Sequence, residues 1–417
     1  MSRAKKILLI VLFLILLSQI PFAYRRYRLG RLNALIQMIN SESRQLAQSR
    51  TRQSNDLSPY AEYKGVVHVH SFLGGHSAGT FQEILDGAIA NQLDFVVMTE
   101  HVESQYDTSA MTLKGPRAGV LFINGNEVAS KQGDRLLSIP GDVSLTSSSG
   151  VSTADVVANS RARNALSIIA YPEEFKSWSE NVDGIEVYNV YTNARRINPL
   201  VALFDTVWSR RAFPALLFAN YLQKPGLGLK KWDEILAGRR AVALAGNDSH
   251  SNVGLSLDDA SGKQLVGLKL DPYETSFRLV RVHVLLPAQV EDSMEVRAQL
   301  DETSLLQAIR AGHCFIGFDL LGDTTNFRFE VRDSRGIQIQ GDEVPLQSDT
   351  RLKILLPASS RLVLYRNGSV MLDETGVKEK EIPVVQAGIY RVEGYLPQLG
   401  KPFSEQPWII SNPIYIK

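Results

Sequence analysis

The sequence of 417 residues contains a single cysteine, Cys314, and almost no excess charge of either sign. One thiol excludes an intramolecular disulfide and a thiolate zinc site, so any metal ion must be held by imidazole and carboxylate groups. The 45 lysine and arginine residues nearly balance 44 aspartate and glutamate residues, which argues against binding of long nucleic acid through bulk electrostatics. The hydrophobic content of 44% suffices for one large domain and a smaller one.

Long apolar runs are also scarce, and the clearest one lies at the N-terminus. Residues 7–17 are almost wholly apolar, and the run continues less cleanly to Tyr24, which brings it near the roughly 20 residues needed to cross a bilayer. A cleaved signal peptide is the alternative, but Pro21 lies where a small residue should precede a cut after Ala23. We therefore expect an uncleaved membrane anchor over 1–24, with the body outside the cytoplasm, either periplasmic or extracellular. Residues 25–60 are predicted to form a juxtamembrane helix and a solvated linker.

Between residues 64 and 319, apolar strands alternate with amphipathic stretches, and polar residues follow the end of each strand. Helices are expected over 80–91, 153–163, 198–210 and 231–237. This order is typical of a parallel β/α barrel, in which functional side chains gather at the carboxyl ends of the strands. A doubly wound open sheet would instead gather its ligands at one switch point. The sequence therefore predicts an α/β barrel.

Side chains that bind divalent metal ions follow several of these apolar runs. Residues i and i+2 of a strand point the same way, so each of two such pairs is predicted to direct two side chains at one ion. A lone histidine at a strand end is usually an ordinary polar residue, and this interpretation is kept for His283 and His313. Repetition along the chain favours a polynuclear site built from His68 and His70, His76, His101, Glu127, and the pair Asp248 and His250.

The order and spacing of these blocks resemble the polymerase and histidinol phosphatase (PHP) superfamily over about residues 64–319. The resemblance implies a distorted (β/α)7 barrel with two or possibly three divalent ions, Mn, Zn, Fe or Mg, at the strand carboxyl ends. It implies that one metal site consists of His68, His70, Glu127 and Asp248, and another of His76, His101 and His250. Glu127, Asp248 and His101 are the catalytic candidates. The blocks are His68-Val-His70 with His76, Phe95 to His101, Glu127, and Gly246-Asn-Asp248-Ser-His250.

Two histidines that are usual in this family are missing, and other residues stand near their places. Asp134 could replace a ligand with a hard oxygen, which would favour manganese or magnesium. Arg135 could instead contact a substrate phosphate with its planar guanidinium. Tyr171, before Pro172, could supply a proton to a leaving group. Arg195 and Arg196 could attract an anionic substrate, or form an ordinary solvated pair.

These residues imply a membrane-anchored, metal-dependent phosphoesterase, either a phosphatase or a phosphodiesterase. It would hydrolyse a small phosphorylated substrate with water activated by the ions. The alternative is a catalytically silent metal-binding barrel with a structural, sensing or partner-binding role. A metallohydrolase of amidohydrolase type is disfavoured because no lysine stands at a strand end.

The chain divides into four predicted segments. The anchor and linker occupy 1–24 and 25–60, and the PHP-like barrel occupies 61–322. Over 323–417, helical periodicity disappears, and short alternating strands separated by turns predict an immunoglobulin-like β-sandwich. The sequence leaves the partner of this sandwich open.

Overall fold

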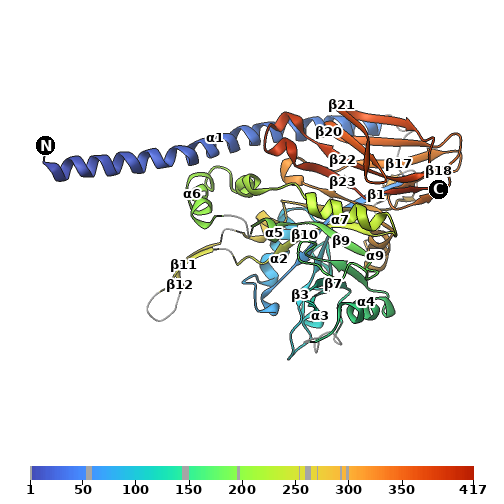
Figure 1. Ribbon diagram of the computed structural model, residues 1–417, viewed down its shortest axis with the longest axis horizontal. Helices are drawn as coiled ribbons and strands as arrows, with labels where there is room; N and C mark the ends of the chain where they lie inside the picture. The colour runs from blue at the N-terminus through green and yellow to red at the C-terminus, as the bar shows by residue number, and fades with distance from the viewer. Residues whose placement is uncertain are drawn as a thin grey trace.

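The computed structural model of the protein describes residues 2–52, 59–142, 150–194, 198–252, 254–258, 264–269, 271–291, 294–296 and 300–417. The protein is a mixed α/β structure with a large β-sheet and a long N-terminal helix that projects from the body (Figure 1).

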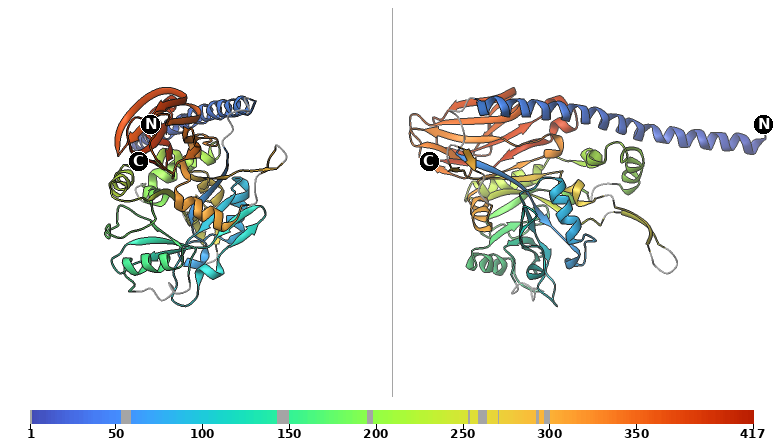
Figure 2. Two further views of the ribbon diagram at one scale, coloured as in Figure 1. Left: turned by 90° about the vertical axis from the view of Figure 1, so that its right-hand side faces the viewer. Right: turned by 180° about the vertical axis from the view of Figure 1, so that it is seen from behind.

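Helix α1 (Arg3–Arg52) combines an exposed apolar part with a packed part (Figure 2). Its side chains over 7–17 are exposed, and within the described part of the chain it is the one helix long and apolar enough to cross a membrane. The helix continues where the sequence predicted a solvated linker. Leu29, Leu32, Ile36 and Ile39 recur at helical spacing and are buried in the core of the C-terminal β region. This apolar stripe explains why the predicted juxtamembrane helix packs against the body of the protein.

The strands of the central region form a circuit in which one step is made by the chain itself, because Thr99 alone separates β2 from β3. β1 pairs in parallel with β2 and with β10, while β2 pairs with β5 and β3 with β6. β7 pairs antiparallel with both β6 and β8, and parallel pairings of β8 with β9 and β9 with β10 complete the circuit. The strands are β1 (Tyr60–Val69), β2 (Phe95–Met98), β3 (Glu100–His101), β5 (Val120–Ile123), β6 (Asn126–Ala129), β7 (Arg135–Ile139), β8 (Leu166–Ile169), β9 (Gly184–Asn189) and β10 (Val242–Ser249).

The circuit encloses an apolar core. Val67, Val97, Ile123, Ile168 and Leu244 from successive strands belong to one buried cluster. Because side chains alternate along a strand, these residues share the inner face and leave the outer face for the helices. Most of the predicted metal ligands lie at the carboxyl ends of β1, β3 and β10, beyond this core, and Glu127 lies in β6, which follows β5.

Helices lie close to the predicted ranges, with local reasons for where they begin. α2 (Phe81–Ala90) and α4 (Thr153–Ala162) both start at capping boxes, formed by Thr80 with Glu83 and by Ser152 with Asp155. α6 spans Pro199–Ser209. α7 (Gly226–Leu236) begins earlier than expected because Gly228 allows contact with β9: a Cβ there would lie 2.2 Å from the Val187 carbonyl oxygen. Shorter helices are α3 (Thr108–Met111), α5 (Val190–Ala194) and α8 (Tyr273–Ser276), with 3-10 turns at Phe72–Gly74 and Pro214–Tyr221.

Antiparallel strands join the circuit to the C-terminal region in one continuous sheet. β13 pairs with β1, β16 with β13, and β23 with β16. Where the sequence predicted short strands, residues 351–366 form one long strand, β20, whose register shifts around Ser360 where it pairs with β21. The further elements are β4 (Gly115–Arg117), β11 (Gly254–Asp258), β12 (Gln264–Lys269), β13 (Arg281–Pro287), β14 (Gln289–Glu291), β15 (Met294–Val296), α9 (Glu302–Ala311), β16 (Cys314–Gly317), β17 (Arg328–Asp333), β18 (Gly336–Ile339), β19 (Glu343–Val344), β20 (Arg351–Arg366), β21 (Ser369–Pro383), β22 (Gly388–Tyr395), β23 (Pro407–Ser411) and β24 (Ile414–Ile416), with 3-10 turns at Asp319–Leu321, Pro397–Leu399 and Phe403–Glu405.

Candidate metal centre

The site is built where β1 and β10 lose their regular register. His68 has φ of 69° and Asp248 has φ of 47°, so both residues adopt the left-handed conformation that side chains usually avoid. The pairings of β1 with β2 and β10 shift register between Val67 and Val69. His68 and His70 therefore converge through a bulge and not through the simple alternation that the sequence predicted. Strained backbone of this kind costs about 1–3 kcal/mol per residue and is common at functional sites.

The structure brings four of the predicted ligands into one buried group: His68, His70, Glu127 and Asp248. His68 Nε2 lies 3.3 Å from Glu127 Oε2 and 3.4 Å from Asp248 Oδ1. His70 Nε2 lies 3.4 Å from each of the same two oxygens. The two nitrogens and two oxygens thus lie around one point, and the four nitrogen–oxygen distances between them are nearly equal.

These nitrogen–oxygen distances match those expected between two ligand atoms that bind the same ion. Metal–ligand bonds of about 2.1 Å in tetrahedral geometry place the ligand atoms roughly 3.4 Å apart. Two of the atoms also lack a hydrogen-bond partner although they are buried, namely His70 Nε2 and Asp248 Oδ1. A buried polar atom without a partner costs free energy, which a bound cation would recover. The residues present therefore fit a divalent cation.

A second possible group is formed by His70, His101 and His250. The His70 ring stacks on the His101 ring at 4.5 Å and on the His250 ring at 4.2 Å between centroids. His101 Nδ1 lies 3.3 Å from Glu127 Oε2, so Glu127 faces both groups. His76, predicted as the third member, is exposed, and its ring lies 5.1 Å from the His101 ring. It lies at the rim of the cluster and outside both groups.

The electrostatics of the cluster favour the metal-binding protonation states of Glu127, Asp248, His70 and His101. His68 is the exception: burial alone would lower its pKa, but Glu186 and Asp248 outweigh burial and raise it well above its usual range, so a bound ion would displace a proton from His68. Burial alone would raise the pKa of Glu127, but the adjacent histidines, His68 foremost, lower it to about 2. His68 likewise outweighs burial and holds the pKa of Asp248 well below its usual range. Burial, reinforced by His250, lowers the pKa of His70 to about 3, and burial lowers that of His101 to about 4. Ionised carboxylates and neutral imidazoles are the forms that bind metal ions.

Glu186 is a buried residue of the site that the sequence did not single out as a candidate. Its neighbours Ile185 and Val187 pack into the cluster outside the circuit, so alternation turns Glu186 inward. Its Oε1 lies 2.9 Å from His68 Nδ1, and its Oε2 accepts a hydrogen bond from Asn189 Nδ2 at 3.0 Å. Gly246 makes room for it, because a Cβ there would lie 2.2 Å from Glu186 Oε1. An acidic residue inside an apolar strand was the available signal.

Glu100 orients the chain beneath the histidines. Its buried carboxylate accepts hydrogen bonds from the Ser71 backbone N–H at 2.9 Å and from Thr112 Oγ1 at 2.7 Å. Ser71 follows His70 directly, so Glu100 ties the end of β1 to β3. Burial raises the pKa of Glu100. Its place within the Thr99-Glu100-His101 block was the signal for this role.

The three residues near the missing histidines have different positions. Tyr171 donates a hydrogen bond from its hydroxyl to Asp248 Oδ2 at 2.6 Å. Arg135 Nη1 lies 3.6 Å from Glu127 Oε1, and its side chain is 40% exposed. Asp134 belongs to neither metal group: its carboxylate accepts hydrogen bonds from Thr153 Oγ1, Ser177 Oγ and the backbone N–H of Lys176. Arg135 and Tyr171 thus border the cluster, whereas Asp134 ties loops together.

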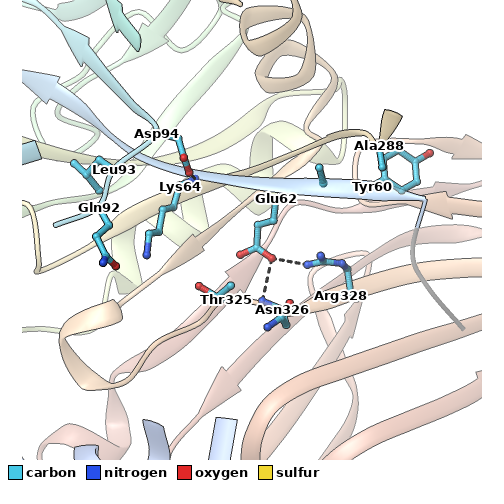
Figure 3. Close-up of a pocket in the computed structure, with 11 residues that line it drawn as sticks. Tyr60, Glu62, Lys64, Gln92, Leu93, Asp94, Ala288, Thr325, Asn326 and Arg328 are labelled. Carbon is cyan, nitrogen blue, oxygen red and sulfur yellow. Dashed lines mark hydrogen bonds and ion pairs between the residues drawn. The ribbon is translucent and has the colours of Figure 1, made fainter. Parts of the chain in front are cut away.

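One predicted pair lies outside the described residues, and one pocket lies away from the cluster. Arg195 and Arg196 fall outside the described residues. A pocket of about 780 Å³ lies at the start of β1, lined among others by Lys64, Asp94 and Arg328. Figure 3 shows Glu62 in this pocket pointing toward Asn326 and Arg328. None of the seven predicted ligands lines it, so we assign the candidate site to the histidine cluster.

Comparisons with known proteins add little to this geometry. No protein-family model and no curated protein matches the sequence. Among solved structures, the crystal structure of PsfC from Pseudomonas syringae PB-5123 is similar over 55% of this chain and 85% of that chain, with 17% identity and a TM-score of 0.34. A likeness at this level carries no argument about fold or function.

Proposed function

We propose that the protein is a metal-dependent phosphoesterase of the PHP type. The observation that carries this proposal is the convergence of buried His68, His70, Glu127 and Asp248 around one point, with His70 Nε2 and Asp248 Oδ1 left without hydrogen-bond partners. Divalent ions held there would supply Lewis acidity and an activated water for attack on phosphorus. Glu127, facing both groups, is the residue placed to serve two ions.

The protein's own residues supply the remaining functions in this proposal. Glu186 fixes the His68 ring so that Nε2 faces the cation. Arg135 presents donors at the rim, where its planar guanidinium would bind and orient a phosphate. Burial and the carboxylates of Glu127 and Asp248 raise the pKa of Tyr171, so its hydroxyl keeps its proton while it orients Asp248.

We also propose the finer fold that accompanies this function. The circuit from β1 to β10 would be a distorted (β/α)7 barrel of PHP type, with an immunoglobulin-like sandwich after it. The hydrogen bond from the Tyr390 hydroxyl to the Gln386 carbonyl supports the sandwich, because a tyrosine corner makes such a bond. α1 would anchor the chain in a membrane, with the body outside the cytoplasm.

The test is metal content and turnover of the full-length protein in detergent. Elemental analysis would measure bound metal, and p-nitrophenyl phosphate and a bis-ester would be assayed with manganese or zinc. We expect wild type and His313→Asn, which alters a histidine paired with Asp342 outside the cluster, to bind metal and turn over. Asp248→Asn should lose both. Metal binding by wild type without turnover of either ester would contradict the enzyme.

That result would favour the second candidate, a silent metal-binding protein. A specific observation supports this alternative: Tyr171 stands near the place of a family histidine and engages Asp248 with its hydroxyl. A phenol that stays protonated does not replace an imidazole ligand, so a further ion would lack a donor there.

A further inference from the structure

Helix α6 lies against the part of α1 where the apolar run ends. The Phe22 and Phe204 rings are 4.9 Å apart, and Trp208 Nε1 donates a hydrogen bond to Gln19 Oε1 at 3.0 Å. Arg25 forms a two-point ion pair with Asp205, with Nη2 2.6 Å from Oδ2. These contacts hold α6 beside residues 19–25 of α1. If α1 spans a bilayer, α6 lies at the depth of the membrane–water interface.

The exposed face of α6 is apolar, while several of its polar residues are buried. Asp205, Thr206 and Ser209 are buried, whereas Leu200 is 67% and Val207 is 71% exposed. Residues seven apart share a helix face, so Leu200 and Val207 point to the same side. A helix that faces water exposes its polar residues and buries its apolar ones, whereas α6 does the reverse. This arrangement suits a helix that rests on lipid.

The residues that flank the contact between α1 and α6 are of types found at the membrane–water interface. Tyr24 and Tyr27 on α1 are 59% and 60% exposed, and tyrosine is enriched at the level of lipid headgroups. Arg210 and Arg211 follow α6 and are exposed, as basic residues beside anionic headgroups would be. α6 thus contacts α1 where the apolar run of α1 ends, and residue types common at the membrane interface border it.

Two segments that leave the metal centre extend toward the same side. Tyr191 lies in α5, in the segment that leads from β9 toward α6, and its ring is 5.9 Å from the His250 ring. The β11–β12 hairpin, which follows His250 in the chain, projects on the side from which the N-terminal part of α1 also projects, as Figure 1 and the right-hand view of Figure 2 show. The segments leaving the site at β9 and β10 therefore both extend toward the expected membrane.

We propose that α6 docks on the lipid surface of the membrane that α1 spans, and that the site acts on the phosphomonoester headgroup of a lipid in that membrane. The substrate part of this inference rests on the proposed phosphoesterase function. Docking does not rest on turnover: it rests on α1 as the membrane anchor and on the contacts between α6 and α1.

Docking is tested without turnover. Full-length protein with Val207→Cys would be labelled with a fluorophore and reconstituted into phosphatidylcholine vesicles containing a lipid with a shallow nitroxide quencher. Cys314 is buried, so the introduced thiol takes the label. Val370, 58% exposed on β21, gives the matched control Val370→Cys. We expect quenching at position 207 on the order of half the emission and little at 370. Equal quenching at both positions would overturn docking. A label at position 207 that a second copy of the chain shields from lipid would overturn it as well.

The substrate class is tested by comparing a lipid with a soluble ester. Vesicles of phosphatidylcholine and phosphatidic acid would report phosphate release from the lipid, and p-nitrophenyl phosphate would report the chemistry alone. We expect the double variant Leu200→Glu with Val207→Glu to lose about tenfold on the lipid while the soluble ester changes by less than about twofold. The matched pair Val370→Glu with Met371→Glu should retain both activities.

The outcomes separate the two proposals. Wild type that cleaves the soluble ester but not the lipid, or an α6 variant that keeps the lipid rate, overturns the lipid substrate and leaves the phosphoesterase standing. Wild type that cleaves neither ester overturns the lipid substrate, and it overturns the phosphoesterase as well if the soluble bis-ester is not cleaved either, while the quenching measurement still decides docking.

Discussion

His68 Nδ1 lies 2.9 Å from Glu186 Oε1, while Nε2 on the opposite side of the ring faces Glu127 and Asp248. This pairing fixes which nitrogen is available to a metal ion. A carboxylate behind a ligating histidine orients the ring and increases its basicity. Glu186 is therefore expected to control metal affinity without contacting the ion.

Glu186→Gln should weaken metal binding by roughly 10- to 100-fold, because the amide supports the ring less strongly than the carboxylate. Competition with a chromogenic chelator would measure the affinity. Glu330→Gln is the control, since Glu330 is also a buried glutamate but pairs with Arg332 in the C-terminal region. Equal affinity of wild type and Glu186→Gln would show that Glu186 has only a packing role.

Tyr171→Phe tests the neighbouring contact on Asp248. The Tyr171 hydroxyl holds Asp248 Oδ2 at 2.6 Å and leaves Oδ1 directed at the cluster. Without the hydroxyl, the carboxylate can turn, and we expect a loss of about tenfold in metal affinity. The same chelator competition would measure it, with circular dichroism to show retained fold. An unchanged affinity would mean that the backbone alone positions Asp248.

The strand-end pattern in the sequence selects seven candidate ligands, because each follows an apolar strand and strand ends meet at one edge. The grouping of His68, His70, Glu127 and Asp248 at one site comes from the resemblance to the PHP superfamily, and the structure brings these four together. The pattern does not reveal Glu186, since a single acid within an apolar strand also fits a partly exposed edge. His76 illustrates the converse: its spacing suggests a ligand, but the turn after β1 leaves it exposed at the rim. Conformation after a strand depends on tertiary packing, which spacing does not encode.

The path of α1 could be predicted only in part for a related reason. Leu29 to Ile39 show helical spacing in the sequence, but the surface that covers them comes from residues far along the chain, including Trp408 and Leu399. Likewise, the register shift that lets β20 run through Ser360 as one strand depends on its partners β21 and β22. Local pattern identifies the apolar face, and only the fold identifies its partner.

The buried stripe of α1 leads to a stability prediction. Leu32 is 1% exposed, so Leu32→Ala should lower the free energy of unfolding by about 2–4 kcal/mol through lost burial and the cavity left behind. Met38, in the same helix, is 68% exposed, and Met38→Ala should change it by less than about 0.5 kcal/mol. Urea denaturation of the full chain in detergent would compare them. Equal stabilities would mean that α1 is a tether in solution.

A buried ion network between β1, β13 and the C-terminal region leads to a pH prediction. His283 Nδ1 lies 2.7 Å from Glu62 Oε1, and Nε2 lies 3.4 Å from Asp319 Oδ2. Glu62 also pairs with Arg328 of β17 at 2.6 Å, so the network joins the circuit to the C-terminal strands. Burial alone would lower the pKa of His283, but Asp319 and Glu62 outweigh it and raise the pKa to about 9.

The sign of the effect follows from this raised pKa. Folding stabilises the protonated form of His283, so the contribution is fully present below its ordinary pKa of 6.5 and is lost as pH rises through about 9. We expect the free energy of unfolding to fall by up to about 3 kcal/mol between about pH 7 and about pH 10, measured by urea denaturation at fixed ionic strength. His283→Asn should be less stable at neutral pH and should lack this decline. A wild type whose stability is constant over that interval, or a variant with the same slope, would show that the network does not hold a proton on His283.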